Sequence, residues 1–214
     1  MQDNQPCLLL VDDEPANLRV MKQILQNDYR LIFAKNGEEA LRLIEQKKPD
    51  LILLDIMMPG MTGLEVCKKV KQDPENSAIP IIFVTALSDE ADEAQGFDLG
   101  AVDYISKPVS APIVRARVRT HLSLVQADVL RATRLQIIQR LGRAAEYKDN
   151  ETGMHVVRMS HYTKVLALAY GINEFQADNL FHAAPMHDLG KIGIADSIML
   201  KPGKLTEEEF TIMK

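Results

Sequence analysis

The 214-residue sequence predicts a doubly wound α/β domain followed by an all-helical segment. Over the first 110 residues, short apolar runs alternate with amphipathic stretches, a pattern typical of a parallel sheet with helices on both faces. After Ser110 no strand candidate follows, and the remaining sequence has helical periodicity. These two observations indicate an α/β body joined to a helical body.

Five apolar runs are the strand candidates of the first domain. Three of them are nearly continuous apolar segments, as expected for parallel strands that are buried on both faces. The candidates are residues 7–11, 30–34, 51–55, 80–85 and 102–106. Between them, amphipathic stretches such as residues 15–26 and 37–46 are expected to be helices.

Residues 110–148 are predicted to form one long helix, because this stretch has no proline after Pro112 and no glycine before Gly142. Apolar residues recur along it at alternating spacings of four and three, which is typical of a helix that pairs with a partner helix. This seam consists of Val118, Leu122, Val125, Val129 and Ala132. We therefore expect a homodimer through this linker helix; the alternative is that the helix packs on its own sheet.

Residues 151–171 and 173–190 are expected to form two further helices, the second of them bent at Pro185. Thr206 and Glu209 have the spacing of a capping box, which predicts the start of a last helix.

Composition argues for a soluble globular protein. Hydrophobic residues make up 46% of the chain and the mean hydropathy is -0.11. No apolar run approaches the roughly 20 residues that span a bilayer, and the N-terminal residues lack the pattern of a secretion signal. Cys7 and Cys67 do not suggest a disulfide framework, so we expect reduced thiols in a cytoplasmic protein without membrane contact.

The net charge of -5 is divided into three blocks. Residues 1–110 have a net charge of -8, residues 111–145 of +6, and residues 146–214 of -3. The central block holds seven arginines, but no helix-turn-helix pattern or zinc-finger spacing accompanies them. We therefore expect a solvated helix face and no nucleic-acid partner.

Five polar residues fall at or after the ends of four predicted strands. Asp12 and Asp13 follow the first, Asp55 ends the third, Thr85 ends the fourth, and Lys107 follows the fifth. In an open parallel sheet the carboxyl ends of the strands meet at one edge, where these side chains would converge. Clustered carboxylates favour a hard divalent cation such as Mg²⁺. The residue types suit attack on a phosphoryl group by an aspartate, with the lysine, the cation and the hydroxyl offsetting its charge.

The motifs "VDDE", "LLDIMMPGMTG", "VTA" and "DYISKP" resemble the receiver domain of two-component response regulators, from about Cys7 to about Leu122. The resemblance implies a flavodoxin-like strand order 2-1-3-4-5, with a sensor histidine kinase as the partner. It further implies Asp55 as the phosphoacceptor. Asp12, Asp13, Asp55 and the backbone carbonyl of Met57 would hold Mg²⁺, and Lys107 would contact the phosphoryl group. Thr85 and Tyr104 would form a switch pair.

A second group of potential ligands lies in the helical part. Glu151 and His155 are four residues apart and so share a helix face, while His187 and Asp188 lie on the next predicted helix. Mixed imidazole and carboxylate ligands suit Fe, Mn or Zn, and Lys191 is placed to contact a phosphate. The alternative is that His187 and Asp188 form a hydrogen-bonded pair at a helix end.

The apolar residues on the helix of Glu151 and His155 predict which side of it is buried. They continue along the face of those two residues, and the expected buried residues are Met159, Tyr162, Leu166 and Ala169.

The segments "AAEYKDNETGMHVVR" and "AAPMHDLGKIGIADSIMLKPGKLTEEEF" resemble the HD-GYP family of cyclic di-GMP phosphodiesterases. The resemblance runs from about Leu135 and implies four metal ligands, with Asp188 bridging two metals. The implied ligands are Glu151, His155, His187 and Asp188, with Lys191 as a phosphate contact. Further histidine ligands and the GYP signature of that family are not matched, so we expect a partial site and little or no hydrolase activity from these 214 residues.

Together the motifs predict a receiver domain (1–122), a linker helix (123–134) and the first part of an HD-GYP domain (135–214). The hypothesis is a phosphorelay response regulator in which phosphorylation of Asp55 controls hydrolysis of cyclic di-GMP. The alternative is a non-enzymatic module that dimerises or docks a partner when it is phosphorylated.

Overall fold

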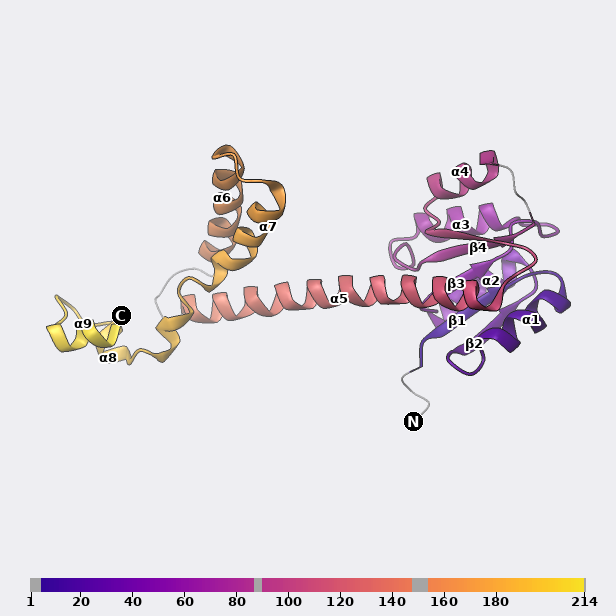
Figure 1. Ribbon diagram of the computed structural model, residues 1–214. Helices are drawn as coiled ribbons and strands as arrows, with labels where there is room; N and C mark the ends of the chain where they lie inside the picture. The colour runs from indigo at the N-terminus through magenta and orange to yellow at the C-terminus, as the bar shows by residue number, and fades with distance from the viewer. Residues whose placement is uncertain (1–4, 87–89, 148–153, 214) are drawn as a thin grey trace. The chain divides into compact units, whose positions relative to one another are not determined.

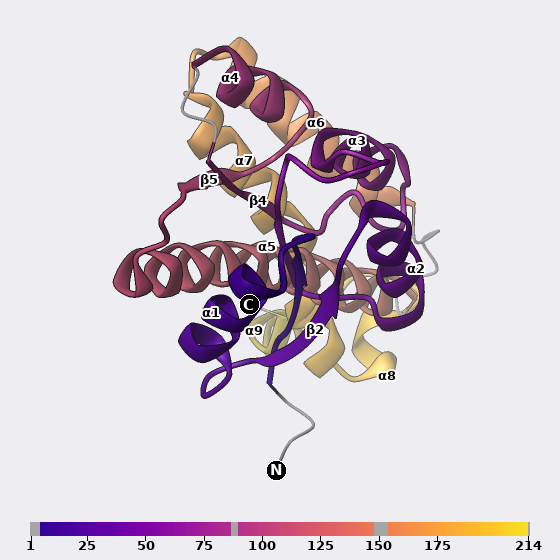
Figure 2. The ribbon, with the colours of Figure 1, turned by 90° about the vertical axis from the view of Figure 1, so that its right-hand side faces the viewer.

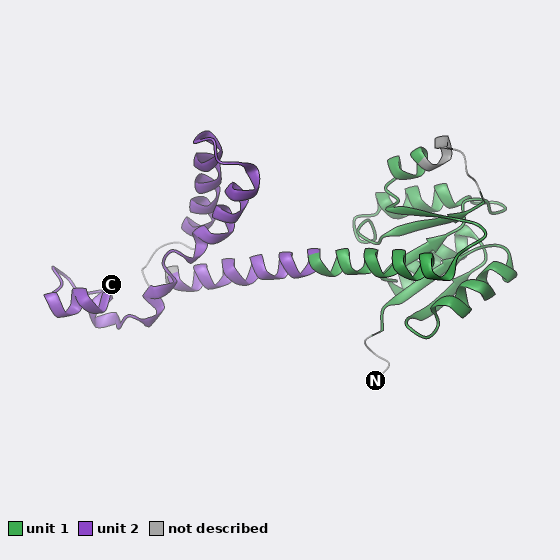
Figure 3. Ribbon diagram, viewed as in Figure 1, with its two compact units in different colours: residues 1–127 green, residues 128–214 purple. Residues whose placement is uncertain are grey.

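The structure, a computed structural model, describes residues 5–86, 90–147 and 154–213. The chain divides into two compact units, an N-terminal unit (Met1–Ala127) and a C-terminal unit (Asp128–Lys214), which Figure 3 distinguishes by colour. Glu151 lies outside the described residues.

The N-terminal unit is built on a five-stranded parallel sheet with the order β2-β1-β3-β4-β5, which confirms the predicted fold class. The strands form because their apolar runs are buried against helices on both sides. Their bounds are β1 Cys7–Val11, β2 Arg30–Ala34, β3 Leu51–Leu54, β4 Ile81–Thr85 and β5 Asp103–Ser106. Asp55 is thus the first residue beyond β3 rather than the last residue within it.

Helices cover both faces of this sheet (Figures 1 and 2). Those of the N-terminal unit are α1 Pro15–Leu25, α2 Gly37–Lys47, α3 Gly63–Gln72, α4 Glu90–Asp98 and the start of α5, Ala111–Tyr147. Alternate residues of the strands point to opposite faces, and they form two hydrophobic clusters. One cluster packs against α1 and α5, and the other packs against α2 and α3.

Two helices of this unit begin at side-chain caps. Asn36 accepts a hydrogen bond from the Glu39 N–H at 2.9 Å, and α2 begins at the next residue. Thr62 and Glu65 form a reciprocal capping box at α3, in which Glu65 accepts from the Thr62 N–H at 2.8 Å. The loop that follows β3 therefore ends at a defined point.

Part of the predicted seam on α5 is buried within the N-terminal unit. Val118 and Leu122 are buried together with Val114 in the cluster under α1 and α5. Val129, in contrast, is 60% exposed. The first residues of the seam therefore pack on the sheet, and only its later residues remain available to a partner.

The C-terminal unit contains short helices after the end of α5. They are α6 His155–Ala169, α7 Glu174–Ala183, η1 Ala184–Met186, η2 Leu189–Gly193, α8 Asp196–Met199 and α9 Glu207–Met213. The predicted capping box is present, because Thr206 and Glu209 exchange hydrogen bonds of 2.7 and 3.2 Å.

The prediction of one bent helix over residues 173–190 was wrong. Helix α7 ends at Ala183, and Pro185 lies in the 3-10 turn η1. Proline has no N–H to donate, so the α-helical hydrogen bonds cannot continue through Pro185, although Ala184 before it keeps helical dihedral angles. Pro185 thus ends the α-helix instead of bending it.

The predicted buried face of α6 was also wrong. Tyr162 is 61% and Leu166 68% exposed, whereas Val156, Ser160 and Ala167 are buried. Helix α6 packs against α7, where Ala177 is buried. Small side chains allow two helix backbones to approach closely, so they occupy the contact while the larger residues lie outside it.

Candidate functional site

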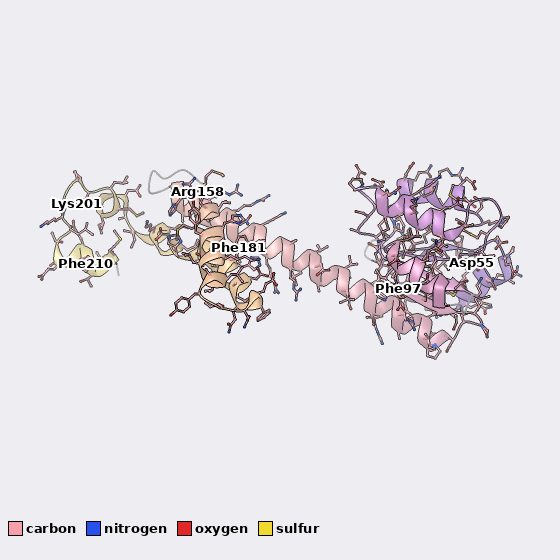
Figure 4. All side chains as sticks on the ribbon, turned by 90° about the horizontal axis from the view of Figure 1, so that it is seen from above. Asp55, Phe97, Arg158, Phe181, Lys201 and Phe210 are labelled. Carbon is pink, nitrogen blue, oxygen red and sulfur yellow. The ribbon has the colours of Figure 1, made fainter. Side chains whose placement is uncertain are left out.

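The carboxyl ends of β1 and β3 bring the acidic residues together. Val11 and Leu54 are paired in the sheet, so Asp12 and Asp55, the residues that follow them, lie side by side. Asp12, Asp13 and Asp55 each offer a carboxylate oxygen, and these atoms lie within 4.8 Å of one another. Figure 4 labels Asp55 in the N-terminal unit. The structure therefore forms the acidic cluster at the expected edge of the sheet.

Lys107, which follows β5, joins two of these carboxylates. Its Nζ donates to Asp12 Oδ2 at 2.8 Å and to Asp55 Oδ2 at 2.7 Å. Asp12 and Asp55 are 6% and 5% exposed, so both ion pairs are shielded from water. One ammonium faces three carboxylates, and the cluster keeps an excess of negative charge that suits a divalent cation.

The electrostatics of the cluster are set by burial and by these contacts. Burial raises the pKa of Asp55 above its ordinary value, although the hydrogen bond and charge of Lys107 act in the opposite direction. Burial also disfavours the charged form of Lys107, but its hydrogen bonds to Asp12 and Asp55 outweigh this effect and raise its pKa. Lys107 therefore stays protonated beside the carboxylates of Asp12 and Asp55.

Two further residues, Asn17 and Gly63, pack closely against Asp12 and Asp55. Asn17, in the first turn of α1, donates through Nδ2 to Asp12 Oδ1 at 3.0 Å. A Cβ on Gly63 would lie 2.1 Å from the Asp55 carbonyl oxygen, so only glycine fits where α3 begins. Asn17 could have been found from its spacing on a helix that starts beside Asp12, whereas Gly63 is the last residue of the motif "LLDIMMPGMTG", which did not reveal its contact with Asp55.

Thr85 and Tyr104 are both buried, at the end of β4 and within β5. The Tyr104 ring lies between those of Phe83 and Phe97, and each ring centroid is 5.2 Å from that of Tyr104. A Cβ on Gly96 of α4 would lie 1.7 Å from the Tyr104 Oη. Tyr104 thus occupies an inward position that depends on the absence of a side chain at residue 96.

The described ligands of the second predicted site are partly gathered. The His155 and His187 ring centroids are 6.2 Å apart, and His187 Nε2 lies 3.0 Å from Asp188 Oδ2. Lys191 Nζ lies 2.9 Å from the same Asp188 oxygen. Across residues 154–213, however, no three ligand atoms lie within 4.8 Å of one another. Among the described residues, Asp188 thus contacts the His187 imidazole and the Lys191 ammonium, and Glu151, the fourth predicted ligand, lies outside them.

None of the helices in the described ranges is long and apolar enough to cross a membrane.

Comparisons with known proteins agree with the geometry of the first site. Residues 8–119 match the family model of the response regulator receiver domain. The whole chain is 43% identical to a "Probable cyclic di-GMP phosphodiesterase" of Vibrio cholerae, of which it covers 55%. Over 97% of its length it is 33% identical to the cyclic di-GMP phosphodiesterase response regulator RpfG of Xanthomonas campestris, of which it covers 61%. The chain therefore spans little more than half the length of these relatives.

A solved receiver domain supports the same assignment. The CheY-like response regulator receiver domain protein from Methanospirillum hungatei is 28% identical, with a TM-score of 0.56. The similarity covers 58% of this chain and 99% of that one. The family match agrees with the order of the parallel strands, the acidic cluster and the lysine after β5. The chain therefore belongs to the response regulators, and its N-terminal unit is a receiver domain.

Proposed function

We propose that Asp55 is the phosphoacceptor of this receiver domain and that a sensor histidine kinase is the donor. An Asp55 carboxylate oxygen attacks the phosphorus atom, and the bond from phosphorus to the kinase histidine nitrogen breaks. The single observation that carries this proposal is the pair of Lys107 contacts, at 2.8 and 2.7 Å, to Asp12 and Asp55. The ammonium is already positioned where negative charge develops during transfer.

Mg²⁺ would be held by Asp12, Asp13, Asp55 and the backbone carbonyl of Met57. The proposal is supported by the three carboxylate oxygens within 4.8 Å of one another and by their excess negative charge. When bound, the cation offsets charge on the phosphoryl oxygens. Thr85, buried at the end of β4, would donate its hydroxyl to a phosphoryl oxygen, and Tyr104 would change position with it.

Phosphorylation by acetyl phosphate tests the role of Asp55. The wild-type chain and a control variant, Asp28→Asn, are expected to gain one phosphoryl group, detected by intact mass. Asp28 is exposed and lies outside the cluster, so its removal should not affect transfer. Asp55→Asn is expected to remain unmodified. Equal modification of Asp55→Asn and wild type would refute the assignment.

We further propose that the receiver controls an HD-GYP output that hydrolyses cyclic di-GMP with Fe, Mn or another divalent transition metal. The similarity to two cyclic di-GMP phosphodiesterases supports this output. Glu151, His155, His187 and Asp188 would be the ligands, with Lys191 as a phosphate contact. Because further histidine ligands and the GYP signature of that family are not matched in these 214 residues, this chain itself should show little or no turnover. Rapid hydrolysis with added Mn²⁺ or Fe²⁺ would contradict that expectation.

The alternative, a dimerising or docking module, is favoured by one observation on α5. Val129 and Ala132, the last two residues of the predicted seam, are exposed on α5, Val129 to 60%. Burial of these side chains against a second copy would remove apolar area from water. Beryllofluoride should then change the mass measured by light scattering in the wild type but not in Asp55→Asn. An unchanged mass in both would contradict control of pairing by Asp55.

A further inference from the structure

A groove in the C-terminal unit lies between one face of α5 and one face of α7, and we call it the α5–α7 groove. Its volume is about 610 Å³, within the range of small-molecule sites. The lining residues recur at helical spacing on each helix, so both faces are continuous. They are Arg131, Ala132, Arg134, Leu135 and Ile138 of α5, and Phe175, Asp178, Asn179 and His182 of α7.

The charge of this groove is positive. Arg131 and Arg134 line the α5 side, and within the described part of the chain neither guanidinium makes an ion pair or a side-chain hydrogen bond. The carboxylate on the α7 side is neutralised, because Asp178 Oδ1 lies 2.5 Å from Lys164 Nζ. Two guanidinium groups therefore face the groove without compensation, which suits an anion such as a phosphate.

A buried polar atom also lines the groove. His182 Nδ1 is shielded from solvent and has no hydrogen-bond partner among the described residues. Buried polar atoms nearly always have a partner in folded proteins, so this unpaired nitrogen is an exception among the residues that line the groove. Asn179, three residues earlier on the same face, adds an amide donor and acceptor.

The rest of the lining is apolar and includes one aromatic ring. Ala132, Leu135 and Ile138 supply aliphatic surface, and Phe175 is 77% exposed. An exposed aromatic ring beside arginines suits stacking of a flat base. The groove thus combines an anion contact, a hydrogen-bonding edge and a stacking surface.

We propose that the α5–α7 groove binds a nucleoside phosphate. The phosphate contacts Arg131 and Arg134, the base stacks on Phe175, and Asn179 and His182 hydrogen-bond to the base edge. None of the described metal ligands, His155, His187 and Asp188, lines this groove, so the proposed site is distinct from those residues. A ligand here contacts residues 131–138 of α5 together with α7, and its binding adds to the stability of the C-terminal unit.

Equilibrium titration of the whole chain tests the proposal, with GMP, AMP, UMP and inorganic phosphate as probes. A chelator is present, so the result depends neither on Asp55 phosphorylation nor on hydrolysis. At least one nucleotide is expected to bind more tightly than inorganic phosphate. Arg131→Gln with Arg134→Gln should weaken binding by at least about tenfold, the effect of losing a charge-assisted hydrogen bond.

The matched control is Arg140→Gln with Arg143→Gln, which removes two exposed arginines of α5 that do not line the groove. This control should bind as the wild type does. A second readout is the NMR signal of His182, which should shift on titration while that of His121 in the receiver does not. Three results would overturn the proposal: no nucleotide binding, equal weakening by both double substitutions, or phosphate binding as tight as nucleotide binding.

Discussion

Replacement of Gly96 by alanine should destabilise the receiver, although alanine is the better helix former. Gly96 lies within α4, and a Cβ there would approach the Tyr104 Oη to 1.7 Å and its Cζ to 2.7 Å. Tyr104 is buried, and its ring centroid lies 5.2 Å from the ring centroid of Phe83 and from that of Phe97. The added methyl group can therefore fit only if the tyrosine leaves its position or α4 moves.

Two effects of opposite sign determine how much Gly96→Ala changes the free energy of unfolding. An added methyl group in a packed interior costs about 1–3 kcal/mol. Alanine in place of glycine inside a helix gains about 1 kcal/mol. The expected net effect of Gly96→Ala is therefore a loss of up to about 2 kcal/mol. In a Tyr104→Ala background the obstructing ring is gone, so the same change should stabilise the receiver by up to about 1 kcal/mol.

The two cysteines provide an assay for this unit alone. Cys7 and Cys67 are the chain's two cysteines, and both are buried in the receiver, at 1% and 0% exposure. Pulsed thiol labelling across a urea series therefore reports unfolding of the receiver and not of the C-terminal unit. The four variants of the cycle are compared by their labelling midpoints. A Gly96→Ala effect of the same sign and size in both backgrounds would refute the proposed contact.

Three further predictions concern single residues of the receiver. Hydrogen bonds from the Thr62 N–H and hydroxyl lower the pKa of Glu65 in the folded protein. The ionised Glu65 therefore stabilises the fold fully above its unfolded-state pKa of about 4.3. This stabilisation is lost as the pH falls through the lower, folded-state pKa. The difference in urea midpoint between wild type and Glu65→Gln should therefore vanish in acid, and a constant difference would contradict this linkage. Asn36→Ala removes the cap of α2 and should cost about 1 kcal/mol in urea unfolding, whereas Asn36→Asp should cost much less. Burial raises the pKa of the Cys67 thiol, so its alkylation by iodoacetamide at pH 8 should be slow until urea unfolds the receiver; labelling of the folded protein at the rate of a free thiol would contradict this.

The receiver fold and most of its site could be predicted because both depend on short-range patterns. Continuous apolar runs mark buried parallel strands, and the polar residues after them must converge once the strands are parallel. Asp12, Asp55 and Lys107 were placed in this way, and two of the carboxylates do meet the lysine. The contacts of Gly63 and Gly96 could not be predicted, because each depends on an atom that another segment brings to the glycine.

The helical part was harder to predict because hydrophobicity alone does not identify a helix contact. Tyr162 and Leu166 are the large residues of α6, yet the packed face uses Ser160 and Ala167, whose small size permits close approach. Pro185 was expected to bend a helix that it instead ends. In both cases the stereochemistry of the backbone outweighed the apolar pattern.

Because one ammonium faces three carboxylates, the stability of the receiver depends on the cations in the surrounding solution. Cations that bind the folded cluster and not the dispersed carboxylates of the unfolded chain raise the free energy of unfolding, by about 1.4 kcal/mol for each tenfold excess over their dissociation constant. Unfolding midpoints measured in chelator and in magnesium buffer therefore describe two different thermodynamic systems. The gap between them is itself a measurement of the affinity of the acidic cluster, obtained without any phosphoryl donor.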